Sequence, residues 1–349
     1  MDRRSFLLAG LAAPFALSHS ALAGDEIFLA DMHSHLFFFG GNTPATKPLA
    51  RSMAAGNVKL LAWSLVGDVP WIRPSPQGLK QTGEPGPGQA LDWFQKDIAR
   101  IKAHLAEQNL KIVLTPADVE RALKGEPHVV LAVEGASFID ADASQLQVAY
   151  DQGIRHLQLV HYIRNPLGDF QTHKPEHQGL TGLGKEVVRE CNRLGILVDL
   201  AHCSPDAVSQ ALEVSKVPVV WSHSSVTRKG KPTWSMPVWK ARQLSLDEAK
   251  AIADAGGVVG LWAMRSDVGG GVEAYAARLA EMADWLGEDH VGFGTDSNAI
   301  VNPAIANYAD LRRVVLLWQE RGMSPDRIRK IAIENYARLL RQAMDARQA

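Results

Sequence analysis

The sequence predicts one α/β domain, a single (β/α)8 barrel of the TIM type, over residues 24–349 of the 349-residue chain. Eight short apolar or β-branched segments alternate with longer amphipathic segments, which is the pattern of repeated β/α units. Some strand segments, such as 217–220, are apolar throughout, as expected of parallel strands that are covered on both faces. No clear linker interrupts the alternation, and one barrel commonly uses about 250 residues or more.

The expected strands and helices follow in a regular order along the chain. The strands cover residues 27–32, 58–66, 129–134, 154–161, 196–202, 217–223, 258–263 and 290–296. The clearest helices cover residues 91–108, 183–194, 246–255, 272–286 and 307–321. Glycines that stop helices stand before three of the strands, at Gly153, Gly195 and Gly257. A further apolar segment at 110–114 is expected to be an extra piece between the second and third units.

Two expected loops are unusually long and follow strands. Both would lie over the C-terminal face of the barrel, where lids and substrate walls sit. The loop at 68–90 contains five prolines and four glycines, which exclude a helix or a central strand. The loop at 228–241 carries Trp234, Met236 and Trp239 among basic residues, which favours a substrate wall. For the first loop, a plain surface loop over buried aromatic residues is an equal alternative.

The composition excludes several classes of protein. With 46% hydrophobic and 21% charged residues, the chain is not a disordered protein. The 37 Lys and Arg residues balance 38 Asp and Glu residues, which argues against a nucleic-acid partner or a polybasic membrane surface. Two cysteines against 12 histidines exclude a disulfide scaffold and a cysteine-rich zinc module. Cys191 and Cys203 are expected to be separate thiols, although an oxidising compartment would permit a disulfide.

An export signal is expected at residues 1–23. Arg3 and Arg4 stand before an apolar stretch at 6–17, and a small-residue cleavage site follows at 21–23. The paired arginines are typical of a twin-arginine signal, so a bacterial periplasmic location is expected. The apolar stretch has twelve residues, fewer than the ~20 that span a bilayer. No later segment is long and apolar enough either, so we expect no membrane span in the mature chain.

Residues that can bind metal stand at the ends of six expected strands. They are His33 and His35, Glu134, His161, His202, His223 and Asp296. A barrel brings the carboxyl ends of its strands to one mouth, so these side chains are expected to converge. Any one histidine could be an ordinary hydrogen-bonded core residue. The whole set favours a two-metal hydrolase, because imidazoles bind zinc and a carboxylate can bridge two ions.

Several stretches of the chain resemble the renal (membrane) dipeptidase family of metal-dependent hydrolases, within the amidohydrolase-like superfamily. The similar stretches are residues 133–135, 159–161 with 165–169, 179–181 with 192–202, 222–225, 292–296 and 335–340. They occur in family order from about residue 27 to 341. The long run that ends at His202 is the most specific of them.

The resemblance implies a role for each residue of the candidate site. His33 would bind the first of two zinc ions, Glu134 would bridge both ions, and His202 and His223 would bind the second. His161 would contact the scissile carbonyl, Asp296 would handle the proton, and Arg242 would pair with the terminal carboxylate of the substrate. The resemblance also implies a dipeptide-like small molecule as substrate and suggests a homodimer.

His35 departs from the family pattern. The first family motif is His-x-Asp, and His35 stands where the Asp is expected. Imidazole is still a good zinc ligand, and His-x-His is the usual motif in the wider amidohydrolase group. The exchange removes one negative charge from the ligands, which could weaken metal retention and make a bound water more acidic. We expect a two-zinc site with His35 as a ligand, and a single-metal site or an altered substrate remains an alternative.

The sequence therefore predicts a zinc-dependent dipeptidase that hydrolyses small dipeptides through a metal-bridging hydroxide. One alternative is a related amidohydrolase that acts on another small amide, an N-acyl amino acid or a lactone, because such barrels carry varied chemistries. Another is an exported metabolite-tailoring enzyme with an altered metal site. A binding protein without catalysis is disfavoured by the intact set of Glu134, His202, His223 and Asp296.

Overall fold

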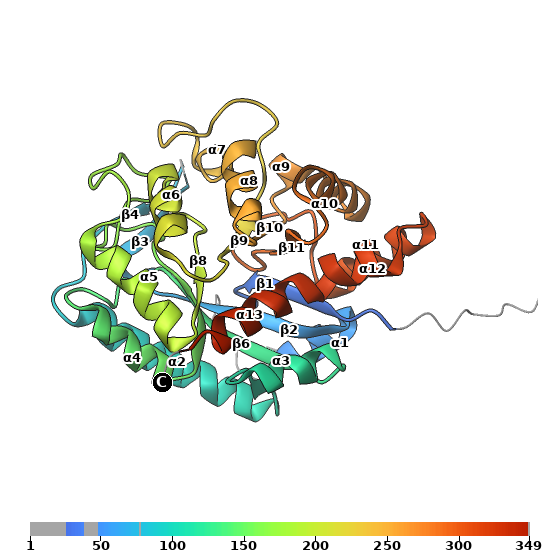
Figure 1. Cartoon of the computed structure of the whole chain (residues 1–349), viewed down its shortest axis with the longest axis horizontal. Helices are drawn as coiled ribbons and strands as arrows, with labels where there is room; N and C mark the ends of the chain where they lie inside the picture. The colour runs from blue at the N-terminus through green and yellow to red at the C-terminus, as the bar shows by residue number, and fades with distance from the viewer. Residues whose placement is uncertain (1–25, 38–47, 77, 348–349) are drawn as a thin grey trace, which may run out of the picture.

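The computed structural model describes residues 26–37, 48–76 and 78–347, and these form an α/β barrel (Figure 1). The expected export signal at 1–23 lies outside the described residues. Parallel strands form the wall in the order β1-β2-β6-β7-β8-β9-β10-β11. Their bounds are β1 Leu29–Ser34, β2 Val58–Val66, β6 His128–Glu134, β7 Ile154–Gln158, β8 Leu197–Asp199, β9 Val220–Ser224, β10 Val258–Leu261 and β11 Val291–Phe293. The predicted barrel of eight parallel strands is confirmed.

The ring closes between β1 and the residues that follow β11. The Asp296 backbone N–H donates to the His33 carbonyl at 3.0 Å, and the His35 N–H donates to the Ser297 carbonyl at 2.9 Å. The closing bonds are thus made by residues of the candidate site itself.

Strands β7, β8, β10 and β11 end earlier than predicted, and for β8 the reason is a local hydrogen bond. The prediction ran one strand to His202, but β8 ends at Asp199. There the Asp199 carboxylate accepts the backbone N–H of Ala201 at 2.9 Å, so this N–H does not continue the ladder. His202 follows in a left-handed conformation, with a φ of 70°. Its side chain is therefore held by a turn and not by a strand.

Helices surround the barrel and form most of the connections between its strands. Their bounds are α1 Leu49–Gly56, α2 Gln89–Glu107, α3 Pro116–Leu123, α4 Leu146–Asp151, α5 Gly182–Leu194, α6 Pro205–Val214, α7 Val238–Ala241, α8 Leu246–Asp254, α9 Arg265–Val268, α10 Val272–Leu286, α11 Tyr308–Glu320, α12 Pro325–Arg329 and α13 Asn335–Asp345. Sequence signals account for their ends: α5 begins where the Thr181 side chain accepts the Gly184 N–H and ends at Gly195, with a φ of 77°. Among the described residues, no helix has both the length and the apolar character needed to cross a membrane.

Two predicted irregular segments contain short strands. The loop at 68–90 includes the hairpin of β3 (Ile72–Ser75) and β4 (Gly78–Gln81), which lies outside the barrel wall. The predicted extra piece at 110–114 contains β5 (Lys111–Ile112), which pairs with β6 outside the main strand order. Cys191 and Cys203 are both buried and free, as expected.

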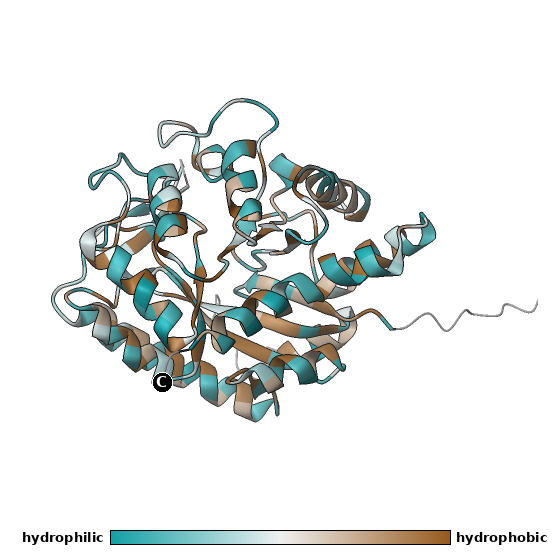
Figure 2. Ribbon diagram, viewed as in Figure 1, coloured by the Kyte–Doolittle hydropathy of each residue, from teal (hydrophilic) through white to brown (hydrophobic). Residues whose placement is uncertain are grey.

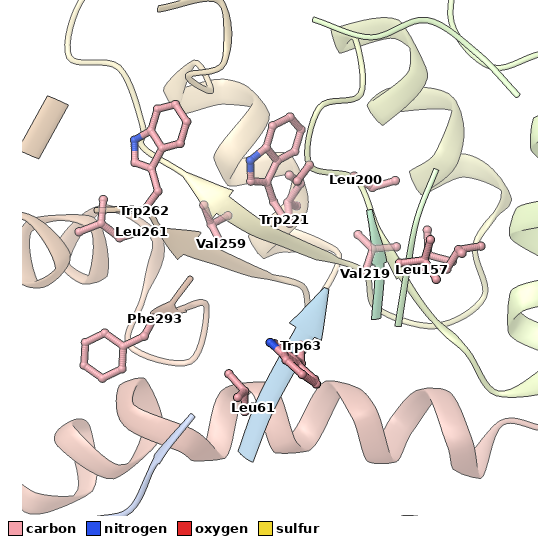
Figure 3. Packing of buried hydrophobic residues seen from close by; sticks show 14 of the residues in the cluster. Leu61, Trp63, Leu157, Leu200, Val219, Trp221, Val259, Leu261, Trp262 and Phe293 are labelled. Carbon is pink, nitrogen blue, oxygen red and sulfur yellow. The ribbon is translucent and has the colours of Figure 1, made fainter. Parts of the chain in front are cut away.

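The apolar core has two layers, inside and outside the strand wall. The strands are apolar, whereas the helices are polar on their outer faces (Figure 2). The outer layer lies between strands and helices and includes Trp63, Trp221 and Phe293 (Figure 3). The inner layer fills the barrel with residues such as Leu60 and Val130. These strand residues alternate with the outer ones along the sequence, as the pleat of a strand requires.

Helix α13 crosses the barrel in Figure 1 and packs against the end at which the strands begin. Tyr336 and Leu340 belong to the inner apolar layer, and the Tyr336 hydroxyl lies 2.9 Å from Nδ1 of the barrel residue His156. Asn335 fastens the helix by donating from Nδ2 to the carbonyls of Glu288 and Val291. This end is therefore filled, and the cleft of the molecule lies at the carboxyl ends of the strands.

Candidate metal centre

Glu134 lies at the middle of the candidate site. It ends β6 and follows Val130 and Ala132, which alternate into the barrel interior, so its carboxylate also points inward. Its side chain is 3% exposed. The next residue, Gly135, has a φ of 83°, and a Cβ there would lie 2.9 Å from the His161 Cβ. Glycine at this position therefore allows His161 to approach Glu134.

Five imidazole rings point their Nε2 atoms at the Glu134 carboxylate. The distances are 3.4 Å from His33, 3.2 Å from His202 and 3.5 Å from His223 to Oε1, and 3.1 Å from His35 and 3.3 Å from His161 to Oε2. The rings come from four different strand ends, and all five are buried. The structure thus brings together every histidine that the sequence predicted for the site.

The residues present fit a metal centre. Nε2 of His33 and Nε2 of His35 lie 3.0 Å apart, and the Nε2 atoms of His202 and His223 lie 3.3 Å apart. Two imidazole lone pairs at such distances repel unless a proton or a cation lies between them. Three groups have ligand atoms within 4.8 Å of one another: His33, His35 and Glu134; Glu134, His202 and His223; and His33, His223 and Asp296. Nitrogen and carboxylate donors of this kind suit zinc and related divalent ions.

Hydrogen bonds at Nδ1 orient the rings of the first pair. Nδ1 of His35 lies 2.8 Å from the Ser64 carbonyl, which can only accept, so this nitrogen carries the proton. Nδ1 of His33 lies 3.2 Å from the Ser64 hydroxyl and 3.4 Å from the Ser222 hydroxyl. Such partners leave Nε2 as the coordinating atom.

Burial and neighbouring charges set the protonation of the rings. Burial lowers the pKa of His33 to about 4. Burial and nearby positive charges hold the pKa values of His202 and His223 well below that of a free imidazole. Burial also acts to lower the pKa of His35, but the charge and hydrogen bond of Glu134, the charge of Asp296 and the hydrogen bond to the Ser64 carbonyl together outweigh burial and raise the pKa to about 9. Three of these four rings are thus held in the neutral form that binds metal.

Asp296 and His161 flank the centre. Asp296 has a φ of 54°, and its Oδ1 lies 3.5 Å from Nε2 of His35. Burial raises the pKa of Asp296 to about 7. His161 is oriented by Asp68, whose Oδ1 lies 2.7 Å from Nδ1 and whose Oδ2 accepts the Tyr162 backbone N–H at 3.0 Å. The carboxylate of Asp68 therefore places the proton of His161 on Nδ1 and directs Nε2 to the centre.

Arg242 reaches the same site from the residue after α7. Its guanidinium is buried and donates from Nη1 to Oε1 of Gln171 at 2.5 Å and from Nη2 to Nε2 of His223 at 3.0 Å. It lies 5.6 Å from the centre of the Trp262 ring. Arg242, to which the family resemblance gives the substrate carboxylate, is therefore a direct neighbour of the predicted metal ligands.

A cleft of about 1340 Å³ opens above the centre. Its lining includes His35, Glu134, His161, His202, His223, Arg242 and Asp296. It also includes Trp234 and Trp239 of the second long loop and the aliphatic residues Val69, Ile72 and Leu79 of the first. His33 lies behind this surface. The predicted substrate wall around Trp234, Met236 and Trp239 does line the cleft, and so does the hairpin β3–β4.

Three residues near the centre were absent from the predicted site. Asp68 lies two residues beyond the end of β2, so the same strand-end signal that identified the histidines could have found it. Tyr162 packs its ring against His161 and His202, with ring centres 4.5 and 5.0 Å apart. Gln171 binds Arg242 from a loop, and no spacing in the sequence marks that contact.

Known proteins are similar to this chain in sequence and in fold. A model of the membrane dipeptidase family, peptidase family M19, matches residues 45–349. The chain is 27% identical over 264 residues to dipeptidase tcpJ from Claviceps purpurea, which covers 73% of this chain. The match spans 60% of the length of that curated relative.

Two solved structures have a similar fold. The dipeptidase AC, a metallo peptidase of family M19, has a TM-score of 0.75 at 23% identity, over 91% of this chain and 99% of that chain. A metallo peptidase from Rhodobacter sphaeroides, liganded with a phosphinate mimic of the dipeptide L-Ala-D-Ala, has a TM-score of 0.72 at 23% identity, over 91% and 100%. The family match covers most of the residues that carry the barrel and the centre. The chain belongs to the membrane dipeptidase family, peptidase family M19.

Proposed function

We propose that this protein is a zinc-dependent dipeptidase that hydrolyses the amide bond of dipeptides with a free terminal carboxylate. The observation that carries the proposal is the convergence of five imidazole Nε2 atoms on Glu134, at 3.1 to 3.5 Å, beneath an open cleft. Membership of the membrane dipeptidase family supports it, as does the dipeptide mimic bound by the Rhodobacter sphaeroides relative.

Two zinc ions would share Glu134. His33 and His35 would complete one site, and His202 and His223 would complete the other. When bound, zinc would polarise the scissile carbonyl and lower the pKa of a water molecule from about 15.7 to about 7. The departure from the family motif at His35 keeps a zinc-binding atom in place and removes a charge.

Asp296 and His161 would have separate roles at the scissile bond. Asp296 faces the cleft beside His35, where it can take the proton of the attacking water and return it to the leaving amine. His161 can donate from Nε2 to the carbonyl oxygen once it is protonated, because Asp68 already holds the proton on Nδ1. The charges of Asp68 and Glu134 outweigh burial and raise the pKa of His161, which favours this donating form.

Arg242 would bind the terminal carboxylate of the substrate. The lone pair of His223 Nε2 cannot accept from Arg242 and bind metal at the same time. In the loaded site, the N–H of Arg242 Nη2 that points at His223 Nε2 is therefore free to donate to a carboxylate, while the contact of Nη2 with the His223 carbonyl remains. A buried arginine beside the centre favours short peptides, whose carboxylate lies one residue from the scissile bond, over proteins.

A turnover screen of the purified, zinc-loaded protein tests the proposal. The panel contains L,L- and L,D-dipeptides, the same dipeptides with an amidated C-terminus, N-acyl amino acids and lactones. We expect hydrolysis of the free dipeptides, two zinc ions per chain by elemental analysis, and a large loss of kcat/KM on amidation. Turnover of lactones or N-acyl amino acids without turnover of dipeptides would instead support the related amidohydrolase.

We propose in addition that residues 1–23 are a twin-arginine export signal and that the mature enzyme is periplasmic. The paired Arg3 and Arg4 before an apolar stretch support this. Changing both arginines to lysine should leave the uncleaved precursor in the cytoplasm of a bacterial host. Undiminished export of that variant would contradict the route.

A further inference from the structure

The cleft is larger than a small dipeptide needs. Pockets that enclose drug-sized ligands measure roughly 300–1,000 Å³, whereas this cleft measures about 1340 Å³. Much of its wall is apolar, although the reacting atoms of a dipeptide are polar. The part of the cleft that a small dipeptide would leave empty therefore favours an apolar group.

Two insertions from opposite sides of the barrel meet above the centre. The hairpin β3–β4 follows β2, and α7 lies in the segment that follows β9. In the ring of eight strands, β2 and β9 are four places apart in either direction. The two insertions still touch, because a Cβ added at Gly78 of the hairpin would lie 3.1 Å from Val238 of α7. The two insertions start at strands on opposite sides of the barrel, so they can touch only across its mouth. They therefore cover part of the cleft.

Exposed apolar side chains collect at the edge of this cleft. Across the part of the chain that the structure describes, the exposed large apolar residues are Leu114, Trp234, Met236, Val301 and Leu316. Three of them line the cleft: Trp234 is 48% exposed, Met236 is 37% exposed and Val301 is 92% exposed. Single exposed apolar residues are ordinary, but several around one opening mark a ligand groove.

The exposed apolar residues of the wall belong to the chain segments that carry Arg242 and Asp296. Trp234, Met236 and Trp239 are carried by the same segment as Arg242, and the Trp262 ring lies 5.6 Å from the Arg242 guanidinium. Val301 follows Asp296 on the same connection. Arg242 would bind the terminal carboxylate and Asp296 would protonate the leaving amine, and both groups belong to the residue on the carboxylate side of the scissile bond.

We propose that the residue on the carboxylate side of the substrate carries a large, flat apolar group, an aromatic amino acid or a larger aryl-substituted one. The aromatic side chains of the wall would stack on this group and exclude water from it. The inference rests on the proposed dipeptidase function and adds to it the substrate class.

Two isomeric dipeptides test the inference with matched composition. Zinc-loaded protein is assayed on Ala-Ala, Ala-Trp and Trp-Ala, each with the L or the D configuration at the carboxylate-side residue. We expect kcat/KM for Ala-Trp to exceed that for both Trp-Ala and Ala-Ala by at least about tenfold. Equal values for Ala-Trp and Trp-Ala, or no gain over Ala-Ala, overturn the inference and leave the dipeptidase function standing. If none of the three dipeptides is cleaved, both the inference and the proposed dipeptidase function are overturned.

Exposed residues allow a variant that spares the fold. Trp234→Ala should reduce the ratio of kcat/KM for Ala-Trp over Ala-Ala severalfold, because the lost side chain contacts only the large group. Leu316→Ala is the matched control, since Leu316 is 44% exposed on α11 and does not line the cleft. An unchanged ratio in Trp234→Ala, or an equal fall in Leu316→Ala, would also count against the inference.

Discussion

The two halves of the metal centre are built differently. The first half, His33 and His35, comes from one strand end, and each Nδ1 has a hydrogen-bond partner. In the second half, His202 stands in a turn, and its buried Nδ1 has no partner among the residues described. Nδ1 of His223 lies 2.9 Å from the Ser222 hydroxyl, so the difference in orientation between the halves lies in His202.

Besides the shared Glu134, the nearest charged neighbours of the two halves are opposite, although a ligand atom of Asp296 also lies within 4.8 Å of one of His223. Oδ1 of Asp296 lies 3.5 Å from Nε2 of His35, in the first half. Nη2 of Arg242 lies 3.0 Å from Nε2 of His223, in the second half. A carboxylate attracts a divalent cation and a guanidinium repels it. The first half should therefore hold metal more tightly, even though it lacks the aspartate of the family motif.

Each half has a buried carboxylate that is hydrogen-bonded to the backbone beside its histidines. Asp31 accepts the backbone N–H groups of His33 and Thr295, at 3.2 and 2.9 Å, and so ties β1 to the end of β11. Asp199 accepts the N–H groups of Ala201 and Ser222, at 2.9 and 3.1 Å, and so ties β8 to β9. Each half thus has one buried carboxylate that joins two neighbouring strands. The difference between the halves therefore lies in the rings and their charged neighbours, and not in these two carboxylates.

Glu134→Gln should affect both halves and have the largest effect. The amide keeps the size of the side chain but removes the charge and one of the two oxygens that the halves share. Loss of an indirect partner of a metal commonly costs 10–100-fold in affinity or activity, so loss of the shared ligand should cost more. We expect activity near that of zinc-free protein and less than one zinc per chain by elemental analysis, with an unchanged circular dichroism spectrum. Two retained zinc ions would show that Glu134 does not bridge them.

Asp296→Asn should separate metal binding from turnover. The amide cannot accept a proton from water, and loss of a positioned base commonly costs about 10²–10⁴-fold in rate. We expect a fall of this size in kcat with two zinc ions retained, measured on a free dipeptide and by elemental analysis. Full activity would end the assignment of Asp296 as the proton carrier, and loss of one zinc ion would make it a ligand of the first half.

The barrel and the converging histidines could be predicted because both follow from local signals. Alternating segments indicate β/α units, and the carboxyl ends of parallel strands meet at one mouth whatever their separation in sequence. Glu134 and His223 are identified in this way from residue type and place alone. The bounds of β8 could not be predicted, because they depend on a hydrogen bond from Asp199 to the chain after the strand.

Contacts between connections were not predictable from the sequence. Asp68 and His161 are 93 residues apart, and their pairing depends on how two loops fold over the mouth. The contact of Gly78 with Val238 has the same origin, since it joins insertions from opposite strands. Hydrophobic periodicity describes the face that an element buries and carries no information about distances between loops.

Chelator competition can compare the halves directly. His33→Ala removes one ligand from the first half, and His202→Ala removes one from the second, so each variant leaves the other half intact. We expect the zinc ion that remains in His202→Ala to bind roughly tenfold more tightly than the one that remains in His33→Ala, because Asp296 attracts it and Arg242 does not repel it. Equal dissociation constants, or the reverse order, would show that the neighbouring charges do not distinguish the halves.

His35→Asp should change only the first half and have the smallest effect. The substitution restores the charge that the family motif places there, which should strengthen zinc binding, but it also loses the bond of 2.8 Å to the Ser64 carbonyl that orients the ring. We expect the zinc dissociation constant of the first half to fall by only a few fold, measured by chelator competition. His35→Asn is the matched control, because it has the size of aspartate without the charge and should bind zinc more weakly than the native protein. If both variants weaken zinc binding to the same extent, the orientation of the imidazole matters more than the missing charge. Asp296 would then already supply the negative charge that the first half needs.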